Sequence, residues 1–164
     1  RGVPGIYLPS LGGHRNDVEA VFREGSARSI NRATIDEARL LAAIADPGSP
    51  ATRISERFLD VLEARVAEPA FHPAAEQTVL DLDRRVFALL RSPDDGPPVL
   101  AVVNLSSAGV HLELDLERIG MTGAEHVDLI SRQSIAAPCG RLAVELAPYQ
   151  VLWLRDRTGA GGPR

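Results

Sequence analysis

Residues 2–8, Gly-Val-Pro-Gly-Ile-Tyr-Leu, form an apolar run that is interrupted only by glycine and proline. Its apolar residues follow one another without strict alternation, which is typical of a strand covered on both faces. The run therefore predicts a buried strand over residues 2–9. A polar loop over residues 10–33 follows at once, and it is longer than the roughly 15 residues beyond which loops without a function become uncommon.

This loop carries polar side chains that no structural role demands, above all Asn16-Asp17 and the segment Arg28-Ser29-Ile30-Asn31-Arg32. Ligands of α/β enzymes bind at the C-terminal ends of parallel strands, so a strand followed directly by such a loop predicts a site in the loop. A structural interpretation stands beside the functional one. Asn and Asp are frequent in turns, and both arginines can pair with carboxylates elsewhere.

The next segment has helical periodicity. Thr34 and Glu37 form a capping-box pattern, which predicts a helix over residues 35–45. A second helix is predicted over residues 51–67, and the Pro-containing segment 68–73 ends it. A short helix is also expected between Asp17 and Phe22.

After Pro73 the apolar period changes from helical to two, which is the period of strands. The candidate strands cover residues 77–82, 85–91, 99–105, 110–116, 126–130, 141–146 and 150–155. Turns rich in Gly, Pro, Ser and Asp separate them, so an antiparallel sandwich-like domain is expected. The glycine-rich end, residues 158–164, is expected to be disordered.

Composition limits the function classes. Of 164 residues, 45% are hydrophobic and 24% charged, so a packed core is feasible, and the net charge of −4 argues against nucleic-acid binding. No apolar run reaches the roughly 18 residues of a membrane span. The single cysteine, Cys139, cannot form an internal disulfide, which fits a cytoplasmic location. Because the His and Cys residues lack metal-ligand spacing, no metal or cofactor is expected.

Five motifs are similar to one enzyme family: Gly2–Tyr7, Arg15-Asn16-Asp17, Arg28–Arg32, Pro69–Pro73 and Leu146–Trp153. Together they resemble the C-terminal part of sucrose-phosphorylase-like sugar phosphorylases of the α-amylase superfamily (glycoside hydrolase family 13). The similarity runs over residues 2–156.

The resemblance implies an α/β then all-β architecture. Residues 1–73 would form the last β/α unit of a (β/α)₈ barrel, and residues 74–157 a C-terminal antiparallel β domain. The implied chemistry is retaining glucosyl transfer between an α-glucoside and inorganic phosphate, with sucrose, glucosylglycerate and glucosylglycerol all open. In this family the catalytic carboxylates come from earlier barrel strands. The chain is thus expected to be the tail of a longer protein, to contain no catalytic residue and to need the missing N-terminal barrel.

The same resemblance implies roles for loop residues. Arg32 would contact phosphate or the glucosyl acceptor, because its planar guanidinium suits oxyanions. Asn16 and Asp17 would hold the acceptor sugar or polyol, and Arg28 and Asn31 would contact substrate or brace the loop.

Two other functions remain open. The chain can belong to a hydrolase or transglucosidase of the same superfamily, which would act without phosphate. It can also be a non-catalytic carbohydrate-binding or assembly module, which would fold and bind sugars by itself.

Overall fold

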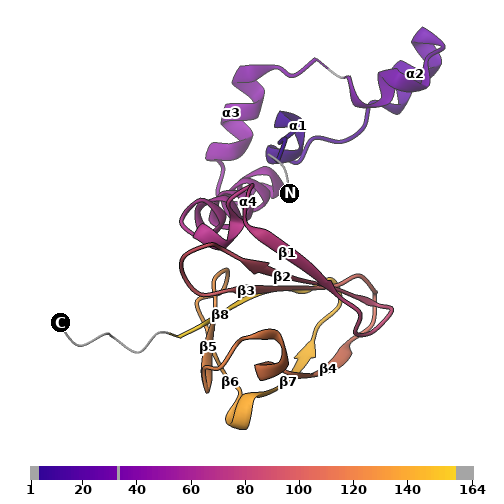
Figure 1. The fold of residues 1–164 in the computed structure, drawn as a ribbon. Coiled ribbons are helices and arrows are strands. Elements are labelled where there is room, and N and C mark those ends of the chain that lie inside the picture. The colour runs from indigo at the N-terminus through magenta and orange to yellow at the C-terminus, as the bar shows by residue number, and fades with distance from the viewer. Residues whose placement is uncertain (1–3, 33, 158–164) are drawn as a thin grey trace. The chain divides into compact units, whose positions relative to one another are not determined.

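The structure is a computed structural model that describes residues 4–32 and 34–157, and these divide into two compact units (Figure 1). The helical unit comprises residues 4–63, and the β unit begins at Ala64. The predicted domains 1–73 and 74–157 stay a prediction, and the expected tail 158–164 lies outside the described residues. No helix in the described part of the chain is long and apolar enough to cross a membrane.

The helical unit holds five short elements. They are α1 Leu8–Leu11, α2 Val18–Glu24, the 3₁₀ helix η1 Ala27–Asn31, α3 Glu37–Ala45 and α4 Pro50–Val66, which continues into the β unit. The helices predicted over 35–45 and 51–67 are thereby confirmed. The predicted cap is wrong, because Asp36 rather than Thr34 precedes α3, and Asp36 Oδ1 accepts a hydrogen bond from the Arg39 amide at 2.9 Å.

The strand predicted over residues 2–9 is wrong where the structure describes it. Residues 4–7 have no regular structure, and Leu8 begins the helical turn α1, with Pro9 in its first turn. A parallel strand depends on hydrogen bonds to neighbouring strands, and the described residues of the helical unit contain none. Proline suits the first turn of a helix, where its missing N–H costs nothing.

The β unit is antiparallel, as predicted. Its strands are β1 Glu76–Leu80, β2 Val86–Ser92, β3 Val99–Asn104, β4 Val110–Asp115, β5 Glu125–Asp128, β6 Ser134–Ala136, β7 Arg141–Leu146 and β8 Val151–Asp156. Six of them form one sheet in the order β1-β2-β3-β8-β5-β6, while β4 and β7 pair in a separate ribbon. Three 3₁₀ helices, η2 Pro69–Phe71, η3 Glu117–Ile119 and η4 Pro138–Gly140, complete it. The sequence did not predict β6.

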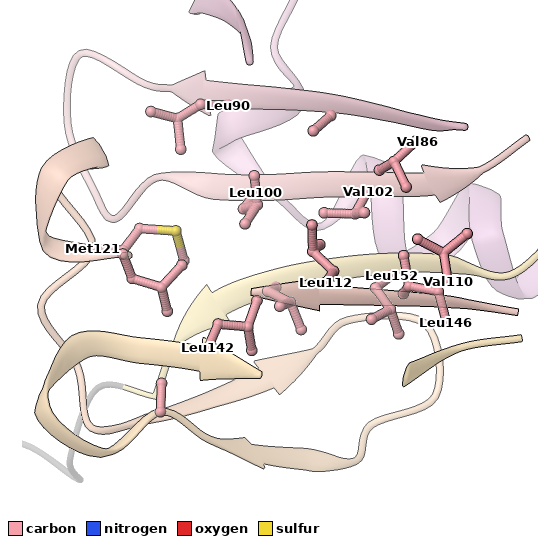
Figure 2. Packing of buried hydrophobic residues seen from close by; sticks show 14 residues of the cluster. Val86, Leu90, Leu100, Val102, Val110, Leu112, Met121, Leu142, Leu146 and Leu152 are labelled. Carbon is pink, nitrogen blue, oxygen red and sulfur yellow. The ribbon is translucent and has the colours of Figure 1, made fainter. Parts of the chain in front are cut away.

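The core lies between the sheet and the β4–β7 ribbon. Figure 2 shows Leu100 and Val102 of β3 facing Leu112 of β4 and Leu142 of β7. Alternation puts every second residue of β2 and β3 in this core. In β4 the buried Val110 and Leu112 alternate with the exposed His111 and Glu113, so the two-residue period in this part of the sequence identified the buried face.

The opposite face of the sheet is covered in part by the segment after α4. Arg91 of β2 donates through Nε to the Ala70 carbonyl at 3.0 Å and through Nη2 to the His72 carbonyl at 2.6 Å. Phe71 meets Trp153 of β8 at 4.5 Å between ring centroids. These contacts explain why the Pro69–Pro73 motif is so apolar, since it forms a second small core.

Candidate functional site

The polar loop of the helical unit folds back on itself. The His14 amide donates to the Pro9 carbonyl at 2.9 Å, and the Asp17 amide donates to the Ile30 carbonyl at 2.7 Å. The Tyr7 hydroxyl donates to the Asn31 carbonyl. Residues 7–9, 14–17 and 30–31, which are separated in the sequence, thus lie together.

Glycine allows the first turn of this loop. Gly13 has a φ of 64°, in the left-handed region that side chains disfavour. A Cβ there would lie 2.5 Å from Ile54 Cδ1 of α4, and a Cβ at Gly12 would lie 2.6 Å from Leu40 Cδ1 of α3. The loop therefore packs closely on both helices.

One hollow of about 220 Å³ opens between the folded segments, and we call it the Arg15 hollow. It is lined by Tyr7, Pro9, Ser10, His14, Arg15, Asn16, Asn31 and Ile35. The Arg15 guanidinium has no hydrogen bond or ion pair with another described residue. The lining thus offers one free guanidinium together with hydroxyl, amide and imidazole groups.

A second hollow, of about 560 Å³, lies against η1, and we call it the Arg32 hollow. It is lined by Tyr7, Ala27, Arg28, Ile30, Asn31 and Arg32. Tyr7 and Asn31 line both hollows, so the two are neighbours. Neither guanidinium of the Arg32 hollow pairs with a carboxylate of the described residues.

The acidic residues nearby have structural contacts. Asp17 Oδ1 accepts from the Ala20 amide at 2.9 Å and so caps α2, and its Oδ2 lies 3.8 Å from Arg23. Glu24 accepts from the Ser29 hydroxyl at 2.5 Å. Because no carboxylate lines either hollow, both favour negatively charged ligands.

The site residues expected from the sequence are placed as follows. Asn16 and Asn31 line the Arg15 hollow, and Arg28, Asn31 and Arg32 line the Arg32 hollow. Asp17 lines neither, so its predicted contact with an acceptor stays a prediction beside its capping role.

Sequence reasoning missed Tyr7 and Ser10 as lining residues. Both fell in or beside the stretch interpreted as a buried strand, yet Tyr7 is 52% exposed. The sequence signal that could have identified Tyr7 as a lining residue was its hydroxyl group, which stands directly before a loop with many polar groups. Among the described residues, no group of three or more His, Cys, Asp or Glu is arranged to hold a metal ion.

Comparisons with known proteins agree with the motifs. The chain is 35% identical over 163 residues to a glucosylglycerate phosphorylase of Spirochaeta thermophila, which covers 93% of this chain and 27% of the relative. A glucosylglycerate phosphorylase of Allomeiothermus silvanus is 35% identical over 156 residues, covering 95% of this chain and 25% of the relative. The chain therefore spans about a quarter of the length of these curated relatives. No family model matches the chain.

The fold has relatives among solved structures too. The E221Q variant of AmyP, solved in complex with maltotriose, has a TM-score of 0.63 and 21% identity, covering 78% of this chain and 24% of AmyP. The resemblance to sugar phosphorylases is confirmed by the two glucosylglycerate phosphorylases, and the likeness to AmyP shows a shared fold.

Proposed function

We propose that this chain is part of a retaining sugar phosphorylase, which exchanges a glucosyl unit between a small α-glucoside and inorganic phosphate. The similarity to two glucosylglycerate phosphorylases over more than nine-tenths of the chain supports the proposal. Retaining transfer uses two carboxyl groups about 5 Å apart, one as nucleophile and one as acid and base. We assign them to the remainder of a longer protein, since neither hollow is lined by a carboxylate.

The observation that carries the proposal is the Arg32 hollow. Its lining includes two arginines, Arg28 and Arg32, beside Asn31, and contains no Asp or Glu. Guanidinium groups bind phosphate through paired N–H donors. We assign phosphate binding to this hollow.

The helical unit also presents an apolar surface suited to packing. A hollow of about 580 Å³ on α4 is lined by Pro50, Arg53, Ile54, Arg57, Phe58 and Val61, and Ile54 is 40% exposed. Continuous apolar surface of this kind is typical of an interface. We propose that the remainder of the longer protein, including the barrel, covers it.

The test measures glucose 1-phosphate formed by the intact protein that carries this chain. Sucrose, glucosylglycerate and glucosylglycerol are supplied with and without phosphate. Arg32→Gln should reduce kcat/KM for phosphate about 10- to 100-fold, because a hydrogen bond to a charged group contributes about 1.5–3 kcal/mol. The control is Arg118→Gln, an exposed arginine of η3 in the β unit, which should leave this value unchanged.

Other outcomes favour the alternatives. Release of free glucose at the same rate without phosphate indicates a hydrolase or transglucosidase. Absence of any turnover, combined with sugar binding by the 164-residue chain alone, indicates a carbohydrate-binding module.

A further inference from the structure

Ser29 has a place of its own in η1. Residues 27–32 all line the Arg32 hollow except Ser29, which is only 5% exposed, whereas Arg28 and Arg32 are exposed. The Ser29 hydroxyl donates to Oε2 of Glu24, the last residue of α2, at 2.5 Å. A hydrogen bond to a carboxylate is roughly twice as strong as one between neutral groups. This bond therefore ties the segment that lines the hollow to the end of α2.

The backbone of Ser29 is equally engaged. Its amide donates to the Ser26 carbonyl at 3.1 Å, and its carbonyl accepts from the Arg32 amide at 3.2 Å. One residue further on, the Ile30 carbonyl accepts from the Asp17 amide at 2.7 Å, which joins η1 to the start of α2. The position of Ser29 therefore influences where the neighbouring lining residues of η1 lie.

Glu24 precedes Arg28 by four residues, yet it does not line the Arg32 hollow. Its Oε1 lies 3.5 Å from Arg23, and its Oε2 accepts from Ser29. Both carboxylate oxygens thus have partners other than the two lining arginines. An ion pair with either arginine would compete with a bound oxyanion, so the bond to Ser29 also keeps this carboxylate engaged elsewhere.

We propose that Ser29, fixed by its bond to Glu24, is a positioning residue of the phosphate site. It holds η1 so that Arg28 and Arg32 are in place before phosphate arrives, which reduces the conformational entropy lost on binding. Neither Ser29 nor Glu24 touches phosphate. This inference rests on the proposed function and extends it, because phosphate binding by the arginines leaves open what positions them.

The test measures the KM for phosphate and kcat in phosphorolysis by the intact protein. Ser29→Ala should raise this KM about 3- to 10-fold, which is part of the roughly 10- to 100-fold that a hydrogen bond to a charged group can contribute. Because the variant retains every group proposed to bind phosphate, kcat at saturating phosphate should change less than about twofold. Ser26→Ala is the matched control, since its hydroxyl lies in the same turn and does not cap η1.

Glu24→Ala separates positioning from plain electrostatics. Loss of a negative charge near the site would by itself lower the KM for phosphate, whereas loss of the acceptor for Ser29 should raise it about 3- to 10-fold. Because the two side chains act as a pair, the double variant should raise the KM no more than either single change. Glu19→Ala, at an exposed glutamate of the same helix, is the control for charge and should not raise the KM.

Three results would overturn the inference while phosphorolysis by the unmodified protein upholds the proposed function. They are a KM for Ser29→Ala equal to that of Ser26→Ala, a lowered KM for Glu24→Ala, and effects that add fully in the double variant. Glu24 is exposed, so its variant gives the result even if Ser29→Ala does not fold.

Calorimetric titration with inorganic phosphate gives a readout that needs no turnover. Weaker phosphate binding by both single variants than by their controls would support the inference even if no glucose 1-phosphate forms. Absence of phosphate binding to the unmodified intact protein would overturn it.

Discussion

Replacing Asn104 should destabilise the end of the β unit where the turns at Ala108 and Ala147 lie. Its fully buried side chain joins two turns: Nδ2 donates to the Ala108 carbonyl at 2.8 Å and to the Ala147 carbonyl at 2.9 Å. Its Oδ1 accepts from the amide and the hydroxyl of Ser106, at 2.9 and 2.8 Å.

The magnitude follows from these four bonds. Each hydrogen bond contributes about 0.5–1.5 kcal/mol net to the free energy of unfolding. The larger values apply where the group that loses its partner stays buried away from water. Ala108 and Ala147 are exposed, so water can reach their carbonyls after the change. We therefore expect Asn104→Ala to lower the free energy of unfolding by about 2–4 kcal/mol. Asn104→Asp should cost at least as much at neutral pH, because a carboxylate would face the two carbonyl oxygens.

Urea denaturation followed by fluorescence gives the measurement. The chain has one tryptophan, Trp153, which packs on Phe71 inside the β unit and so reports on that unit. Ser107→Ala, in the same turn but exposed, is the control and should change the free energy by less than about 0.5 kcal/mol. If Asn104→Ala shifts the unfolding midpoint no more than this control, the reasoning is refuted.

Two further predictions concern charged side chains. Glu68→Gln should destabilise the β unit by about 1–3 kcal/mol in the same assay, since the buried carboxylate accepts from Arg155 at 2.7 Å and from the Ala70 amide at 3.2 Å; an unchanged midpoint would contradict this. The hydrogen bonds from His111 to Glu113 and Glu145 raise the pKa of the imidazole above 6.5, so an NMR titration should place its midpoint above that value. The stability that His111 contributes relative to His111→Gln is fully present below pH 6.5, and it should disappear as the pH rises through the raised pKa. If the stability difference between the unmodified protein and His111→Gln instead grew as the pH rises, the ion pairs of His111 would be contradicted.

Local sequence patterns predicted the elements whose partners are near in the chain. β4 was found because its polar and apolar residues alternate, and its burial alternates with them. β3 was found as an apolar run between turn residues, and the structure buries it on both faces. β6 was missed because Ser134–Ala136 is too short to show a period. The cap of α3 was misplaced because Thr34 and Asp36 both suit the position, and only the backbone geometry selects Asp36.

The error at the start of the chain has a different cause. An apolar run forms a parallel strand only if neighbouring strands offer hydrogen-bond partners. The run itself does not show whether such strands are present. Asn16, Arg28, Asn31 and Arg32 were singled out because they lie in one polar loop, and that loop closes on itself. Their roles in binding stay predictions. What sequence could not show is the division of the lining between two hollows that share Tyr7 and Asn31.

That division suits the proposed reaction. In retaining phosphorolysis the acceptor oxygen leaves, and the phosphate oxygen later attacks, on the same side of the anomeric carbon, so both oxygens take the same position in turn and their sites must meet there. The two hollows share Tyr7 and Asn31, while each has its own arginines. On the proposed function, phosphate binding in the Arg32 hollow depends on Arg28 and Arg32, so a substitution confined to the Arg15 hollow need not weaken it.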